Sequence, residues 1–181
     1  MTFSELASRV FEQIGQHHRY AHSVRVARCA EILALRHGLD TRKARLAGML
    51  HDLARLYAPQ RLIAECEARG MAISPQERAH PTLLHARLGA QLARELFAVE
   101  DRDVLSAIEK HTTGADEMSP LDCAVYLADS LEPARNFAER GELWELALRD
   151  LEGATRETLR HAAEHYARKA AEAARSLSSA S

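Results

Sequence analysis

The sequence predicts an all-α protein built as one bundle of helices. Ala, Leu, Arg and Glu, which favour helices, are abundant, whereas Val, Ile and Thr are scarce. No segment shows the apolar–polar alternation of a half-buried strand. The 181 residues are the usual size of one domain. We expect that domain to span residues 1–176, followed by a disordered tail over residues 177–181.

Turn-forming and capping residues divide the chain into helices. Gly38 is suited to end one helix, and Asp40 is suited to cap the next. Gly114 breaks a later helix, and Glu132-Pro133 interrupts another. In chain order, we expect helices over residues 4–14, 18–37, 41–52, 59–70, a short segment from 75, 81–97, 101–112, 120–131, 143–149 and 154–174.

Two short sequences are typical of helix N-termini. Ser74-Pro75-Gln76-Glu77 and Ser119-Pro120-Leu121-Asp122 each place an acidic residue three positions after a serine, which is the spacing of a capping box. Each also has proline at the first helical position, where the missing N–H costs no hydrogen bond. Both motifs therefore predict that a helix begins at the proline.

Charge and hydropathy exclude several classes of protein. The formal net charge of −2 gives no electrostatic footprint for nucleic acid or for an anionic membrane. No apolar stretch approaches the roughly 20 residues that a transmembrane helix needs, and the N-terminus does not resemble a signal peptide. Cys29, Cys66 and Cys123 lack CxxC spacing, so we expect buried, reduced thiols. We expect a cytoplasmic protein with no nucleic-acid or membrane partner.

A set of histidines and aspartates stands out because four members lie on the apolar faces of four different expected helices and the other two form a His-Asp pair at the end of a fifth. A buried carboxylate costs several kcal/mol unless it is paired or bound to a metal ion. Six metal-type ligands that face one core therefore predict a metal centre. The set comprises His22, His51, Asp52, His85, His111 and Asp129.

Each member of this set also has an ordinary structural explanation. A single inward histidine is more often a core residue with a satisfied hydrogen bond than a metal ligand. Asp129 could pair with a buried arginine or cap a helix. Burial of all six for unrelated reasons is much rarer, since ionisable groups seldom lie inside proteins. His161 and His165 are one helical turn apart and could bind a metal, but their charged surroundings favour a solvated face.

Imidazole and carboxylate ligands suit iron, manganese, zinc or cobalt. Where two such ions lie together, they form a clamp for attack on phosphorus and make hydroxide available near neutral pH, and a metal-bridging hydroxide would then be the nucleophile. A phosphate substrate would also need cations and hydrogen-bond donors, and the alternative for each arginine is a surface ion pair. The candidates for substrate contact are Arg55, which follows Asp52 by one turn, then Arg25 and Arg135, with Thr112, Thr113 and the backbone at Gly114.

The order His22, His51-Asp52, His85, His111, Asp129 resembles that of the HD-domain phosphohydrolases. Three segments are more specific: Ala47-Gly48-Met49-Leu50-His51-Asp52-Leu53-Ala54-Arg55, His111-Thr112-Thr113-Gly114 and Ala128-Asp129-Ser130-Leu131-Glu132-Pro133. Together they resemble the YqeK-type symmetrical bis(5′-nucleosyl)-tetraphosphatases.

The resemblance implies a five-helix HD core over about residues 18–135, with a C-terminal helical extension, and two metal ions, typically iron. His22, His51, Asp52 and Asp129 would bind one ion; Asp52, His85 and His111 would bind the other. It also implies symmetrical cleavage of diadenosine tetraphosphate into two ADP by a homodimer, with Asp52 and Arg55 in catalytic roles.

This chain departs from the family pattern at Arg55, where lysine is frequent, and at Leu53 and Ser130, where aromatic residues are frequent. The planar guanidinium of arginine can bind phosphate through two hydrogen bonds, whereas the ammonium of lysine acts as a point charge. Two other functions remain open: hydrolysis of nucleoside mono- or triphosphates, and a non-catalytic, metal-dependent sensor module.

Overall fold

The computed structural model describes residues 2–178, which form helices joined by turns and short loops, with no strand among them. This confirms the expected all-α fold. The helices in chain order are α1 (Phe3–Ile14), α2 (His17–Arg36), α3 (Thr41–Leu50), α4 (Pro59–Ala68), α5 (Pro75–Ala79), the 3₁₀ turn η1 (Pro81–Leu83), α6 (Leu84–Phe97), α7 (Arg102–Lys110), α8 (Pro120–Leu131), α9 (Arg140–Ala147) and α10 (Leu151–Ser178).

The helix starts follow the caps read from the sequence. The Asp40 side chain accepts hydrogen bonds from two backbone N–H groups at the start of α3. Both predicted capping boxes form, at Ser74 before α5 and at Ser119 before α8. Gly38 has a φ of +68°, a left-handed conformation that favours glycine after a helix.

Several segments differ from the expected helices. Helix α3 ends at Leu50 rather than at residue 52, and α9 spans Arg140–Ala147 rather than residues 143–149. The segment expected as one helix over residues 81–97 is divided, because η1 forms its first turn and α6 the rest. The last helix starts at Leu151 and continues to Ser178, so two residues expected in the tail are helical. Residues 179–181 of that expected tail lie outside the described residues.

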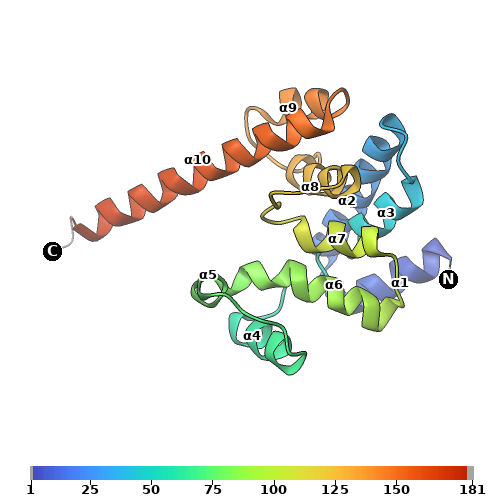
Figure 1. The fold of residues 1–181 in the computed structure, drawn as a ribbon, viewed down its shortest axis with the longest axis horizontal. Coiled ribbons are helices and arrows are strands. Elements are labelled where there is room, and N and C mark those ends of the chain that lie inside the picture. Colours follow the sequence, from blue (N-terminus) through green and yellow to red (C-terminus); the bar gives the residue numbers. More distant parts are fainter. Residues whose placement is uncertain (1, 179–181) are drawn as a thin grey trace.

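The core consists of α2, α3, α6, α7 and α8, which pack against one another in the centre of the molecule (Figure 1). Helix α1 covers α2 and α3, whereas α4 and α5 lie beside the start of α6. Helices α9 and α10 pack on α8, and the C-terminal half of α10 extends away from the body. The five central helices match the five-helix core that the resemblance implied.

Small residues let the two central helices α2 and α3 approach closely. A Cβ atom at Gly48 would lie 2.7 Å from the Cα atom of Ala27. Only glycine fits at this crossing without a shift of one backbone, so Gly48 fixes the distance between the helices. The three cysteines are buried and free, as expected. No helix in residues 2–178 has both the length and the apolar character needed to span a bilayer.

Candidate metal centre

The structure brings all six candidate ligands together. Five are buried, and the Asp129 side chain is 18% exposed. Each core helix contributes to the cluster, so the site forms only when the whole core is packed. The positions are His22 in α2, His51 and Asp52 just after α3, His85 in the first turn of α6, His111 just after α7 and Asp129 in the last turn of α8.

The end of α3 allows two adjacent residues to face the same site. Neighbours on a continuous helix point about 100° apart. Helix α3 ends at Leu50, and the chain turns at His51 and Asp52. A Cβ atom at Gly89 would lie 3.2 Å from the His51 carbonyl oxygen, which shows how closely α6 approaches this turn. Asp52 can therefore face α6 and α7 while His51 faces α2.

The two carboxylate oxygens of Asp52 face two different pairs of histidines. Oδ2 lies 3.8 Å from His22 Nε2 and 3.6 Å from His51 Nε2. Oδ1 lies 3.5 Å from His85 Nε2 and 3.8 Å from His111 Nε2. A carboxylate in this position can bridge two metal ions, one on each side.

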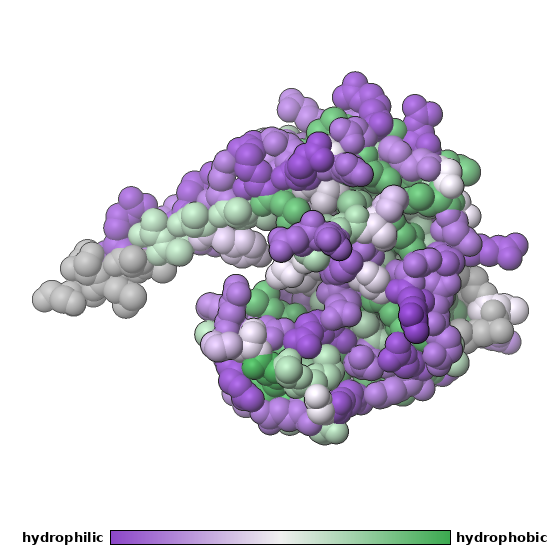
Figure 2. Space-filling view, in the orientation of Figure 1, coloured by the Kyte–Doolittle hydropathy of each residue, from purple (hydrophilic) through white to green (hydrophobic). Residues whose placement is uncertain are grey.

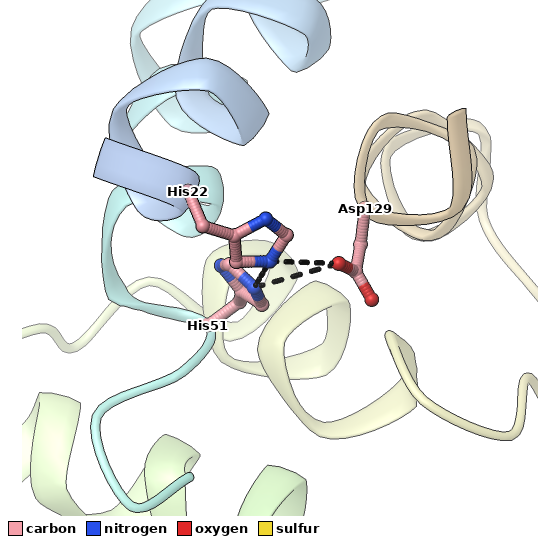
Figure 3. Close-up of side chains that lie close together, drawn as sticks. All are labelled: His22, His51 and Asp129. Atoms are coloured by element: carbon pink, nitrogen blue, oxygen red, sulfur yellow. Dashed lines mark hydrogen bonds and ion pairs between the residues drawn. The ribbon is translucent and has the colours of Figure 1, made fainter. Parts of the chain in front are cut away.

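Asp129 completes the first group (Figure 3). Its Oδ1 lies 3.0 Å from His22 Nε2 and 3.8 Å from His51 Nε2, and these two nitrogens are 3.3 Å apart. In the second group, the Nε2 atoms of His85 and His111 are 3.2 Å apart. Two overlapping sets have ligand atoms within 4.8 Å of one another, which is close enough to share one ion. One set is His22, His51 and Asp129, and the other is His51, Asp52 and His111.

The hydrogen bonds on the other side of each imidazole leave Nε2 available. Every Nδ1 faces an oxygen and can donate its hydrogen to it, so the lone pair falls on Nε2. Three partners are carbonyl oxygens one turn earlier in the chain: Gly48 for His51 at 2.8 Å, Thr82 for His85 at 2.5 Å and Ile108 for His111 at 2.6 Å. Four Nε2 lone pairs that converge fit a metal cation, and such second hydrogen bonds are typical of metal-ligating histidines. The Thr112 hydroxyl is a hydrogen-bond donor within 3.2 Å of two of these nitrogens.

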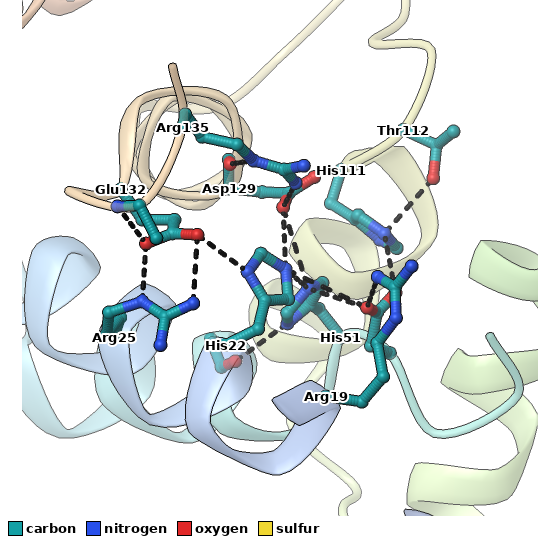
Figure 4. A network of polar contacts seen from close by, with 12 residues as sticks. Arg19, His22, Arg25, His51, His111, Thr112, Asp129, Glu132 and Arg135 are labelled. Carbon is teal, nitrogen blue, oxygen red and sulfur yellow. Dashed lines mark hydrogen bonds and ion pairs between the residues drawn. The ribbon is translucent and has the colours of Figure 1, made fainter. Parts of the chain in front are cut away.

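The fourth partner is Glu132, which the sequence analysis had treated only as a helix interruption. Its Oε1 lies 3.1 Å from His22 Nδ1. Arg25 holds the same carboxylate with two contacts, from Nε at 2.6 Å and from Nη2 at 3.2 Å (Figure 4). Burial would raise the pKa of Glu132, but its bonds to Arg25, the Ala134 N–H and His22 lower it to about 2. The ionised carboxylate therefore fixes the orientation of His22.

Burial and neighbouring charges set the protonation of the cluster. Burial lowers the pKa of His85, and it lowers the pKa of His111 to about 3. For Asp52 and Asp129, burial alone would raise the pKa. For Asp52, the neighbouring imidazoles outweigh burial and lower the pKa. For Asp129, chiefly the hydrogen bond to His22 outweighs burial and lowers the pKa. Neutral imidazoles and ionised carboxylates are the forms that bind metal ions.

Two arginines contact the carboxylates from the open side of the site. Arg19, which the sequence analysis did not select, has its Nη1 3.5 Å from Asp52 Oδ2. It precedes His22 by three residues, so the shared helix face was the available signal. Arg135 donates to Asp129 twice, from Nη2 to Oδ1 at 2.6 Å and from Nε to the carbonyl oxygen at 2.9 Å.

Four of the six candidate ligands line a cleft of about 550 Å³, a volume typical of small-molecule sites: Asp52, His85, His111 and Asp129. Among the expected substrate-contacting residues, Arg55, Thr112 and Arg135 line this cleft. Thr112 Oγ1 lies 3.1 Å from His111 Nε2. The other three expected contacts do not line it: Arg25 is engaged by Glu132, Thr113 is exposed, and Gly114 packs against Leu159.

Comparisons with known proteins identify the family of this chain. A family model for the HD domain matches residues 19–134. A Bacillus subtilis (strain 168) protein named symmetrical bis(5′-nucleosyl)-tetraphosphatase is 35% identical over 161 residues, which cover 89% of this chain and 86% of that protein. A Halalkalibacterium halodurans protein of the same name is 38% identical over 139 residues, which cover 76% of this chain and 73% of that protein.

A solved structure shows the same fold. It is described as a predicted HD superfamily hydrolase involved in NAD metabolism from Clostridium acetobutylicum. The two structures superpose with a TM-score of 0.89 at 33% sequence identity, and the match covers 94% of this chain and 89% of the other.

The fold, the ligand cluster and these matches define a hydrolase of the HD-domain family, to which the chain belongs. Within that family, its relatives include symmetrical bis(5′-nucleosyl)-tetraphosphatases, which confirms the resemblance read from the three sequence segments.

Proposed function

We propose that this protein cleaves diadenosine tetraphosphate symmetrically into two ADP. The observation that carries the proposal is the position of Asp52, whose two oxygens face separate pairs of histidines. That arrangement suits two metal ions, and two ions suit attack on a phosphoric anhydride. The names and overall similarity of the relatives from Bacillus subtilis and Halalkalibacterium halodurans support the choice of substrate.

The donor set suits iron, and manganese, cobalt or zinc would be accepted by the same atoms. His22, His51, Asp129 and Oδ2 of Asp52 would hold one ion; His85, His111 and Oδ1 of Asp52 would hold the other. When bound, such a pair supplies a shared hydroxide nucleophile at neutral pH and stabilises negative charge on the phosphates.

The arginines of the cleft would bind the phosphate chain. Arg55 and Arg19 lie on the cleft wall, so their guanidinium groups can approach phosphate oxygens beside Asp52. Arg135 is already held by Asp129, which fixes its planar group at the cleft wall. The Thr112 hydroxyl can donate to a phosphate oxygen near His111. Binding by several fixed cations favours a highly charged substrate.

Product analysis tests this proposal. Freshly purified protein with ferrous iron is incubated with diadenosine tetraphosphate, and the nucleotides are separated by anion-exchange chromatography. ADP as the only product supports the proposal. A mixture of ATP and AMP would contradict the point of cleavage. Preference for a nucleoside mono- or triphosphate in a parallel panel would favour the alternative hydrolase, and binding without turnover would favour a sensor module.

We also propose that the protein acts as a homodimer, as the resemblance implies. Light scattering coupled to size-exclusion chromatography tests this. A mass near 40 kDa, twice the chain mass of 20.1 kDa, supports the dimer, and the chain mass itself would contradict it.

A further inference from the structure

One face of α10 forms a wall of the cleft outside the metal centre. The residues of this face recur at spacings of three and four along the helix: Thr158, His161, His165 and Arg168, together with Tyr166. Figure 2 shows the hollow that lies beneath the projecting helix. Figure 1 places α10 on one side of this hollow and α5 and α6 on the other. The roles assigned so far use none of these residues.

Thr158 has a buried hydroxyl without a partner. The residue is 5% exposed and lines the cleft, yet its Oγ1 makes no hydrogen bond. Arg19 has the same feature nearer the metal centre, where its buried Nε also lacks a partner. Buried polar groups are nearly always satisfied. Both residues line the cleft, but the two atoms are covered in this conformation, so each side chain must rotate to present its donor to a ligand.

The remaining polar residues of this face suit an anionic ligand. His161 is half-buried, and its Nε2 lies 3.3 Å from Glu157 Oε1, which leaves Nδ1 for a ligand. His165 and Arg168 are exposed and follow at spacings of four and three residues. A row of nitrogen donors along one helix face can follow a chain of phosphates or the hydroxyls of a ribose.

Aromatic rings are also exposed in this cleft. Tyr166 is 70% exposed and Phe137 is 39% exposed, and both line the cleft. Large aromatic side chains usually bury most of their surface in a folded protein. Exposed rings beside phosphate-binding groups are typical of sites in which a nucleobase stacks on the protein.

We propose that this face of α10, with Phe137, binds one nucleoside phosphate half of the substrate. The inference rests on the proposed function and deepens it. A symmetrical cut places a nucleoside diphosphate on each side of the metal centre, so the cleft must receive a nucleoside on both sides. The α10 face receives one half, while Arg55, Thr82 and Leu83 line the cleft around the other.

The test is equilibrium binding of ADP and of pyrophosphate to the as-purified protein by titration calorimetry. Pyrophosphate lacks the base and the ribose, so it reports the phosphate-binding part alone. Tyr166→Ala should weaken ADP binding by about fivefold or more, the scale of one lost stacking contact, and should leave pyrophosphate binding unchanged. Tyr166→Phe keeps the ring and should restore ADP binding.

Two further variants test the polar part of the face. Thr158→Val removes only the unsatisfied hydroxyl, so the protein should fold normally and bind ADP more weakly. Arg168→Ala should weaken ADP binding as well. Arg156→Ala is the matched control, because this exposed arginine lies on the same helix outside the cleft. It should bind ADP like the unmodified protein.

Binding separates this inference from the proposed function. Variants that bind ADP as tightly as the unmodified protein would overturn the α10 site, whether or not diadenosine tetraphosphate is cleaved. An unmodified protein that does not bind ADP would overturn it as well. If the variants lose ADP binding and the unmodified protein leaves diadenosine tetraphosphate intact, the nucleoside site stands and the proposed reaction falls.

Discussion

Glu132 accepts a hydrogen bond from His22, with 3.1 Å between Oε1 and Nδ1, so a residue outside the six candidate ligands orients one of them. Arg25 holds Glu132 in turn, through two short contacts. A carboxylate behind a ligating histidine fixes the ring and makes its other nitrogen a better ligand.

Glu132→Gln should therefore weaken metal binding by about 10- to 100-fold, the usual effect of losing such a partner. Glutamine keeps the size of the side chain and removes the charge that holds His22 and Arg25. The measurement is competition with a chromogenic chelator. Glu142→Gln, which changes an exposed acid on α9, is the control and should bind metal normally. Unchanged affinity in Glu132→Gln would show that His22 needs no such support.

Metal removal should lower the melting temperature. Ions that bind only the folded state stabilise it by about 2.7 kcal/mol when the free ion is 100 times its dissociation constant. Calorimetry with and without a chelator measures the shift. In Asp52→Asn the shift should largely vanish, because the variant loses the carboxylate that faces both histidine pairs. A full shift in that variant would exclude a shared role for Asp52.

Arg55→Ala should reduce kcat/KM for diadenosine tetraphosphate by about 10- to 100-fold, because a hydrogen bond to a charged group contributes about 1.5–3 kcal/mol. Arg55→Lys should recover part of this loss, since lysine keeps the charge without the planar guanidinium. Arg94→Ala removes an exposed arginine at the last turn of α6 and should have no effect. Equal activity of the two alanine variants would remove Arg55 from the site.

Gly48→Ala should destabilise the protein by about 1–3 kcal/mol, as added atoms do in a packed core. The new Cβ would lie 2.7 Å from the Cα of Ala27, so α2 and α3 must separate, and His51 moves with α3 away from His22. Gly141→Ala is the control. It lies within α9 with no atom within 4 Å of the new Cβ, and it should be neutral or slightly stabilising. Chemical denaturation compares the two.

Local sequence signals were enough to predict most of the fold. The capping boxes at Ser74 and Ser119 and the cap at Asp40 act within one helical turn, so they can be read without tertiary structure. The convergence of the six ligand-type residues could also be predicted, because the apolar face of each helix must point to the core. The break between η1 and α6 could not be read from the sequence, since neither glycine nor proline stands at the boundary between Leu83 and Leu84.

Side-chain partners across helices were harder to predict. Arg19 and Arg25 lie three residues before and after His22, so both share its helix face. Arg25 meets Glu132 because the chain turns after α8, whereas Arg19 faces the cleft. The sequence pattern of α10 indicated a solvated face for His161, and its position in the cleft wall depends on how α10 packs against α8 and α9.

Anomalous X-ray diffraction from crystals grown with iron or manganese measures directly whether Asp52 joins two metal ions. We expect two anomalous peaks in each chain, one on either side of Asp52. The first should lie among His22, His51 and Asp129, and the second should lie beside His85 and His111. A single peak, or two peaks with Asp52 bound to only one of them, would contradict a centre in which Asp52 joins two metal ions.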